Sequence, residues 1–157
     1  MTKVFQVDTG GTLTTGLVSY YPLSDGTDVW GGNNATNTNT TFGSGKVGNG
    51  GVFNGSARLV PANNFTWTQV SVAAWVNMNT SGGGYLFIKN SPNYDQHAYF
   101  EIEMSCTPNH LLIHTRNTSA QIYYASYNAA ISTNTWHHVV GILDEVNHLA
   151  PCRWNIG

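Results

Sequence analysis

Charged side chains are scarce in this sequence. Asp, Glu, Lys and Arg together make up 9% of its 157 residues, whereas an average soluble domain has about 25%. Exposed helix faces normally carry Glu and Lys, so this shortage argues against a helical protein. The net charge is −2, and the 6 basic side chains are scattered singly along the chain. Because phosphate-rich partners require clustered Lys and Arg, we expect neither nucleic acid nor an anionic membrane surface as a partner.

Long apolar runs and cysteines are also scarce. No apolar run approaches the roughly 18 residues of a membrane helix, so we expect no membrane insertion. The N-terminal segment has Lys3 but no continuous apolar stretch after it, so it does not resemble a secretory signal. The two cysteines, Cys106 and Cys152, fit no zinc or redox motif. One disulfide and two free thiols both remain open for this pair.

Asn, Thr, Ser and Gly take the place of charge at the surface, a mixture that suits strands and turns. Apolar side chains alternate with a period of two, which predicts strands at Val70–Val76, Tyr99–Met104, Leu111–Thr115, Ala120–Ser126 and His137–Leu143. Turn-rich stretches separate them at residues 31–44, 79–84, 90–96 and 117–119. The pattern predicts an all-β protein, an antiparallel sandwich or barrel.

Four segments resemble successive pieces of one known family. They are GLVSYYPL at residues 16–23, GKVGNGGVFNG at 45–55, VSVAAWVN at 70–77 and WHHVVGILD at 136–144. In order and spacing they resemble the laminin-G-like domains of the concanavalin A-like lectin and glucanase superfamily. The resemblance implies an antiparallel jelly-roll β-sandwich, with Trp75 and Trp136 packed in its core.

The same resemblance sets our expectation for domain organisation. Residues 1–157 should form a single domain, with residues 1–15 as an N-terminal strand or arm. In the family, further strands follow the Trp-His-His segment and close the sandwich. Here residues 145–157 form an atypical tail in which Pro151 would interrupt a central strand. We therefore expect a C-terminally incomplete jelly roll.

Two clusters of aromatic and polar residues are candidate sugar-binding sites. A pyranose offers an apolar face to an aromatic ring and hydroxyl groups to polar neighbours. One cluster contains Tyr94, Asp95 and Tyr99, and the other contains Trp30 and Asn33. The alternative is that these rings anchor their loops. The segment from Asp25 to Gly45 is expected to be an ordered loop, with Val29, Trp30 and Phe42 as apolar anchors.

Calcium is the one metal that the residues favour, because it prefers carboxylate and carbonyl oxygens. Asp28 falls where the family often has the Asp of an Asp-x-Ser-Gly-x-Gly loop. Here the segment reads Asp28-Val29-Trp30-Gly31-Gly32-Asn33, which departs from that loop. Asp28 is therefore a candidate calcium ligand, with a turn-capping role as the alternative. No other cofactor is expected.

Two acidic residues are the candidates for catalysis if the chain is an enzyme. Glu101 and Glu103 lie on one face of a predicted strand, about 6.6 Å apart along the backbone, while retaining glycosidases hold two carboxyl groups roughly 5–5.5 Å apart. Related glucanases add a third acid, but Met104, Ser105 and Cys106 follow here. We expect a solvated outer face and no enzyme activity.

Our functional hypothesis from the sequence is a non-catalytic extracellular recognition module that binds glycans or a cell-surface protein. The alternative is a structural subunit of a surface filament or virion. In that case an open sandwich would self-associate by pairing its exposed strand edges. A glycoside hydrolase using Glu101 and Glu103 is a weaker alternative. The expected location is extracellular or on a particle surface.

Overall fold

The computed structural model describes residues 14–63, 69–79, 84–89, 99–105, 110–116, 122–127, 131–144 and 152–156. Within these ranges all regular secondary structure is β-strand, and every pairing is antiparallel. The all-β class predicted from the sequence is confirmed. The chain separates into two compact units, unit 1 at Met1–Phe65 and unit 2 at Thr66–Gly157.

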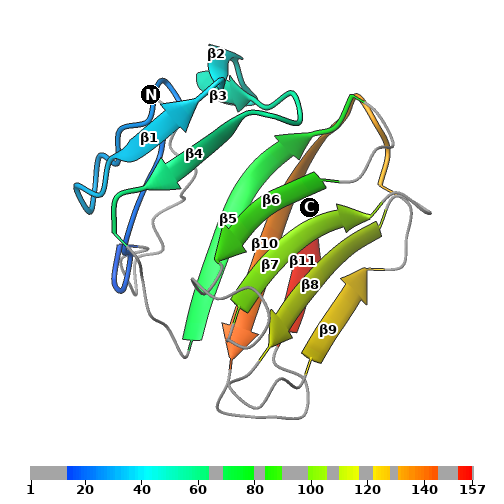
Figure 1. Ribbon diagram of the computed structural model, residues 1–157. Helices are drawn as coiled ribbons and strands as arrows, with labels where there is room; N and C mark the ends of the chain where they lie inside the picture. Colours follow the sequence, from blue (N-terminus) through cyan, green and yellow to red (C-terminus); the bar gives the residue numbers. More distant parts are fainter. Residues whose placement is uncertain are drawn as a thin grey trace. The chain divides into compact units, whose positions relative to one another are not determined.

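Unit 1 contains two short strand pairs (Figure 1). Strand β1 (Ala35–Thr38) pairs with β4 (Arg58–Pro61), and β2 (Thr41–Ser44) pairs with β3 (Asn49–Val52). The sequence predicted only turns at residues 31–44, so β1 and β2 correct that prediction. Asn37 explains how a Thr-rich segment forms two strands. Its side chain exchanges two 2.9 Å hydrogen bonds with the backbone of Thr40 and so closes the turn between them.

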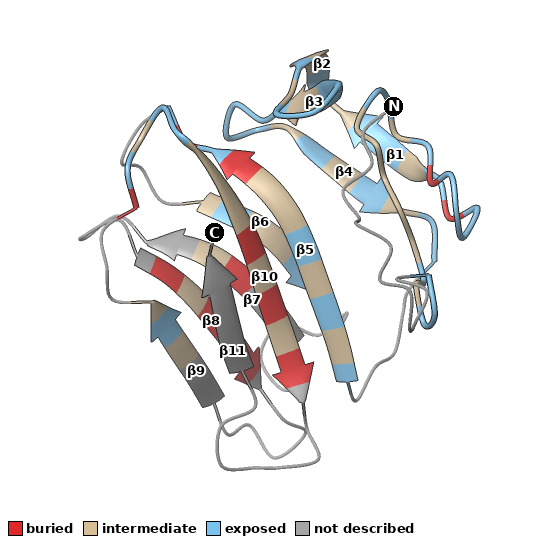
Figure 2. Cartoon of the chain, turned by 180° about the vertical axis from the view of Figure 1, so that it is seen from behind, coloured by how far each residue is buried: buried red, intermediate tan, exposed pale blue. Residues whose placement is uncertain are grey.

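Unit 2 consists of two sheets. One has the strand order β11-β10-β5, and the other has the order β6-β7-β8-β9. The strands are β5 (Gln69–Asn77), β6 (Gly84–Lys89), β7 (Tyr99–Ser105), β8 (His110–Arg116), β9 (Ile122–Tyr127), β10 (Trp136–Asp144) and β11 (Cys152–Ile156). In Figures 1 and 2 the two sheets lie face to face.

Five of these strands, β5, β7, β8, β9 and β10, confirm the strands predicted from alternation. Strand β6 was not predicted, because its few residues lie between turn-forming Gly and Asn-Ser-Pro segments. Strand β11 lies within the predicted atypical tail. It begins directly after Pro151 and pairs with β10 at one end of the sheet order, a position that tolerates a neighbouring proline.

The core of unit 2 lies between its two sheets (Figure 2). One cluster contains Val76, Met78, Leu111, Ile131 and Val139, and a second contains Ile102, Ile113 and Leu143. Contact is close where the sheets face each other: a Cβ placed on Gly141 of β10 would lie 2.7 Å from Cδ1 of Ile102 on β7. The sheets therefore pack as a two-layer sandwich, as alternating apolar residues predict.

The two tryptophans expected in that core lie elsewhere. Val76 occupies the core face of β5, and because side chains alternate along a strand, Trp75 points to the opposite face. Its indole packs on the imidazole of His138 on β10, with ring centroids 5.1 Å apart and ring planes at 50°. Trp75 and Trp136 are both half-buried, and neither belongs to either core cluster. The expectation taken from the family is corrected for both residues.

Candidate functional site

A loop of unit 1, residues 17–34 and called here the Asp28 loop, is organised around one carboxylate. Asp28 is 3% exposed. Its Oδ1 accepts backbone N–H groups from Tyr20 at 2.9 Å, Trp30 at 3.0 Å and Gly31 at 3.0 Å. Its Oδ2 accepts the backbone N–H of Asn33 at 3.1 Å. One side chain thus ties an earlier part of the loop to the turn that follows it.

These hydrogen bonds also set the charge of Asp28. Burial by itself would raise the pKa of this carboxyl, because it disfavours the ionised form. The N–H groups of Tyr20, Trp30 and Gly31 outweigh burial and lower the pKa from 3.8 to about 2. Asp28 is therefore ionised at neutral pH, and its negative charge is what the surrounding N–H groups stabilise.

Two asparagines also hold the loop, through hydrogen bonds that do not involve the carboxylate of Asp28. Asn34 Oδ1 accepts the backbone N–H of Asp28 at 3.0 Å. Asn33 is 3% exposed; its Oδ1 accepts the N–H of Asn63 at 2.7 Å, and its carbonyl accepts the Tyr21 hydroxyl at 2.5 Å. Burial raises the pKa of Tyr21, which keeps its hydroxyl protonated as a donor. Asn33 thus holds the loop to residue 63, and its burial does not favour the predicted direct contact with a ligand.

Trp30 is the exposed aromatic side chain of this loop. Its indole is 52% exposed, while its ring Nε1–H donates to the carbonyl of Leu17 at 2.9 Å. Two further apolar residues of the loop, Val18 and Val29, are 48% and 58% exposed. We call Trp30, Val18 and Val29 the Trp30 platform. Val29 and Trp30 were expected to be apolar anchors of the loop, but both are exposed. The Trp30 ring joins the loop to Leu17 through its hydrogen bond, as the anchoring alternative describes, and it remains accessible.

Gly31 allows two segments of the loop, at Val18 and at Asp28, to lie close to each other. A Cβ at this position would overlap the carbonyl oxygen of Val18 and lie 2.9 Å from Asp28 Oδ2. Any side chain here would therefore push apart the segments that Asp28 joins. The loop geometry depends on glycine at residue 31 for steric reasons.

The other predicted ligand-binding residues belong to unit 2. Tyr94 and Asp95 lie outside the residues that the structure describes. Tyr99 begins β7 in unit 2, where its backbone pairs with Arg116, and its side chain is not described. The structure thus brings together Asp28, Trp30 and Asn33 from the predicted set.

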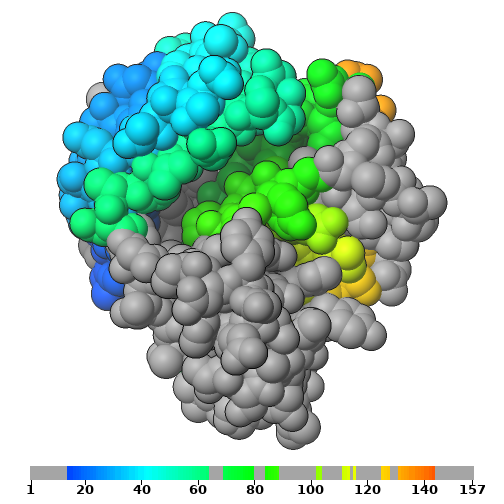
Figure 3. All heavy atoms as spheres, viewed as in Figure 1, coloured from blue at the N-terminus to red at the C-terminus, as the bar shows by residue number. Residues whose placement is uncertain are grey.

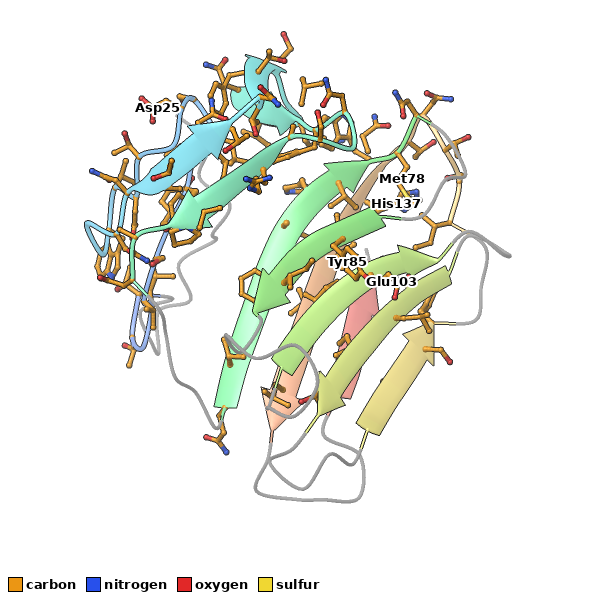
Figure 4. All side chains as sticks on the ribbon, in the orientation of Figure 1. Asp25, Met78, Tyr85, Glu103 and His137 are labelled. Carbon is orange, nitrogen blue, oxygen red and sulfur yellow. The ribbon has the colours of Figure 1, made fainter. Side chains whose placement is uncertain are left out.

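The acidic pair lies in unit 2. Glu103 of β7 is half-buried and pairs with Tyr85 of β6, and Figure 4 shows both on neighbouring strands. Tyr85 is 55% exposed. Glu101 occupies the register position opposite Ile88 and His114. Glu103 therefore lies on the outer face of this sheet, opposite buried Ile102, as the alternation predicted. The side chain of Glu101 lies outside what the structure describes.

Metal binding finds little support in this geometry. Across the described part of the chain, no three His, Cys, Asp or Glu side chains gather closely enough to hold an ion. Asp28 already accepts four N–H groups, which use lone pairs that a calcium ion would need. Calcium at Asp28 stays a prediction, and the turn-capping alternative describes the contacts seen.

Sequence reasoning missed three parts of the site. Tyr20, Leu17 and Asn63 supply the contacts that join Asp28, Trp30 and Asn33 to distant segments. The spacing of Asp28 from Trp30 and Gly31 is a recognisable signal, because Asp side chains often bond to N–H groups two or three residues later. The contacts to residues 17, 20 and 63 have no such local signal.

Comparison with known proteins identifies the family. Residues 48–150 match the laminin G family model described as Concanavalin A-like lectin/glucanases superfamily. The match spans more than half of the chain, so the protein belongs to this family. No curated protein and no solved structure gives a match. The Asp28 loop precedes the matched residues, so its role rests on its own geometry.

Proposed function

We propose that this protein is a non-catalytic recognition module that binds glycans through the Trp30 platform. The observation that carries the proposal is that Trp30 is about half exposed while both its backbone N–H and its ring N–H are held by hydrogen bonds. Membership of a superfamily that includes many carbohydrate- and protein-binding domains supports the proposal. The superfamily also includes glycosidases, so the experiment below includes a test for cleavage.

A fixed, exposed indole suits the apolar face of a sugar ring. Binding normally costs the conformational entropy of each side chain that becomes ordered. Trp30 donates its Nε1–H to Leu17 and its backbone N–H to Asp28, so much of its conformational entropy is already lost before the ligand arrives. Val18 and Val29 add exposed apolar surface on the same loop. The proposed contact is therefore stacking of a pyranose on the indole.

The charge of the loop favours neutral glycans. Residues 17–34 contain Asp25 and Asp28 and no Lys, Arg or His. Hydrogen bonds from Thr27 lower the pKa of Asp25, and its carboxylate accepts the Thr27 N–H at 2.7 Å. Asp25 lies on the outside of unit 1 in Figure 4. Two negative charges with no nearby cation in sequence disfavour sulfated and carboxylated glycans.

Location follows from the proposed role. Laminin G-like domains are usually extracellular, and we propose that this module acts outside the cell or on a particle surface. In the described residues no helix has the length and apolar character needed to span a bilayer.

A glycan array tests the proposal. Wild-type protein should bind neutral glycans, Trp30→Ala should lose this binding, and Phe53→Ala should keep it. Phe53 is the matched control because it is 50% exposed in the same unit. Parallel arrays with a chelator test calcium, and we expect binding to persist. Binding to no glycan, or equal loss in both variants, would contradict the proposal. Release of reducing ends from a bound polysaccharide would replace it with a hydrolase.

One observation favours a second candidate, a structural subunit assembled by strand pairing. Strand β6 stands at the end of its sheet order, and its Tyr85 and Ile88 are 55% and 41% exposed. Atoms of β6 contribute to the face seen in Figure 3. Edge strands with exposed apolar side chains tend to pair with strands of other chains. Size measurement at increasing concentration tests this candidate: a monomer throughout would remove it, and an oligomer dissociated by Ile88→Lys would support it.

A further inference from the structure

Two Asn-Gly pairs occur in unit 1, and the structure places them in different settings. Asn54 and Gly55 lie in the loop between β3 and β4, where both are exposed. Asn49 and Gly50 begin β3 and pair with Ser44 and Gly43 of β2. The two pairs share the same chemistry but differ in backbone freedom, so they form a comparison within one molecule.

The first pair has room to move. A Cβ placed on Gly55 would meet no atom within 4 Å, and the residue has a φ of +85°, which glycine adopts readily. The Ser56 hydroxyl donates to Asn54 Oδ1 over 3.3 Å. A hydrogen bond to this oxygen withdraws electron density from the side-chain carbonyl carbon and makes it a better electrophile.

The second pair is restrained. A Cβ placed on Gly50 would lie 3.1 Å from Gly45 Cα, and a Cβ placed on Gly45, which directly follows β2, would lie 2.5 Å from the carbonyl oxygen of Asn49. Bringing the Gly50 nitrogen to the Asn49 side chain requires rotation within a paired strand. Such rotation requires local opening of the hairpin first, which lowers the population able to react.

We propose that Asn54 is a site of spontaneous deamidation, and that the folded structure makes it react faster than Asn49. The backbone nitrogen of Gly55 loses its proton and forms a bond to Cγ of Asn54. The bond from Cγ to the side-chain nitrogen breaks, and ammonia leaves with that proton, which gives a succinimide ring. Water then opens the ring at either carbonyl and yields aspartate or isoaspartate. No oxidant, reductant or enzyme takes part.

The product changes this loop in two ways. Either product adds a negative charge to a chain whose net charge is −2. Isoaspartate also places an additional carbon in the backbone between β3 and β4, which alters how the loop connects them. The proposal is independent of glycan binding, because neither Asn54 nor its neighbours belong to the Trp30 platform.

Asn54, Gly55 and Ser56 form an Asn-x-Ser sequence, which some hosts glycosylate. Peptide mapping by mass spectrometry therefore tests the proposal on the 157-residue chain made in bacteria, where no glycan blocks the Asn54 side chain. During incubation at neutral to mildly basic pH, Asn54 should convert at least about tenfold faster than Asn49. In denaturant the two rates should approach each other, because the contrast comes from the fold. Similar native rates, or faster conversion at Asn49, would overturn the proposal.

Two variants sharpen the test. Ser56→Ala should slow conversion at Asn54 several-fold and leave Asn49 unchanged, because it removes the hydrogen bond that activates the carbonyl. Asn54→Gln should abolish the fast conversion and the acidic shift of the intact protein in isoelectric focusing. If the acidic shift persisted in Asn54→Gln, the reactive residue would lie elsewhere and the assignment would fail.

Discussion

Trp30 donates its backbone N–H to the carboxylate of Asp28 over 3.0 Å, so an exposed ring and a buried acid belong to one hydrogen-bonded unit. The four N–H groups that this acid accepts all come from its own loop. The role of Asp28 is to hold the segment that carries the ring, together with the N–H groups of Tyr20, Gly31 and Asn33. Stability of the loop and binding at Trp30 should therefore depend on the same residue.

Replacing Asp28 tests this dependence. Asp28→Asn removes the charge and turns an NH₂ group toward N–H donors, so we expect the free energy of unfolding to fall by about 2 kcal/mol. Chemical denaturation measures the change. Asp25→Asn is the control, since Asp25 is exposed and its hydrogen-bonding partner is Thr27. Equal effects of the two substitutions would show that the Asp28 contacts do not stabilise the loop.

The low pKa of Asp28 predicts a dependence of stability on pH. Because folding lowers the pKa from 3.8 to about 2, the ionised carboxylate stabilises the fold above about pH 4. This contribution is lost as the pH falls from about 4 to 2, where the native carboxyl takes up its proton. Thermal denaturation across this range should show a steeper loss for wild type than for Asp28→Asn. Parallel curves would contradict the assigned pKa.

Binding should follow the aromatic character of residue 30. For a glycan identified on the array, Trp30→Ala should weaken binding by about tenfold or more, and Trp30→Phe by less, because a ring remains for stacking. The melting temperature should change little, since the indole is about half exposed. Calorimetric titration provides the affinities. A Trp30→Phe variant as weak as Trp30→Ala would point to the ring N–H contact with Leu17 rather than to stacking.

The sandwich of unit 2 makes its own prediction. Ile102 is 1% exposed between the sheets, whereas Ile88 is 41% exposed on β6. Ile102→Ala should lower the free energy of unfolding by about 3 kcal/mol, and Ile88→Ala by less than about 1 kcal/mol. Denaturant titration measures both. Similar losses would mean that the sheet faces are assigned incorrectly.

The sequence predicted the sandwich strands well because alternation is a local property. Val70, Val72, Ala74 and Val76 share the core face of β5 as their spacing requires. Trp75 shows the limit of transferring a family position: its neighbour Val76 takes the core face, and the indole packs on His138 instead. Alternation determined the side of the strand correctly where the family expectation did not.

The candidate site was predictable only in part. Asp28 was predicted from the sequence as a candidate calcium ligand, and Trp30 with Asn33 as an aromatic and polar cluster that suits a sugar. The sequence could not show how the three residues are connected. Tyr20, Leu17 and Asn63 contact these residues only because the chain folds, and no local sequence pattern indicates those contacts. Burial of Asn33 and exposure of Trp30 likewise depend on tertiary packing, so their roles could be separated only in the structure.

Chemical-shift mapping by ¹H–¹⁵N NMR, using a neutral glycan that binds on the array, tests the central claim most directly. The account predicts shifts at the Trp30 indole N–H and at the backbone amides of Val18, Val29 and Gly31, with little change in β10. Shifts confined to β6–β9, with the Asp28 loop unaffected, would contradict it.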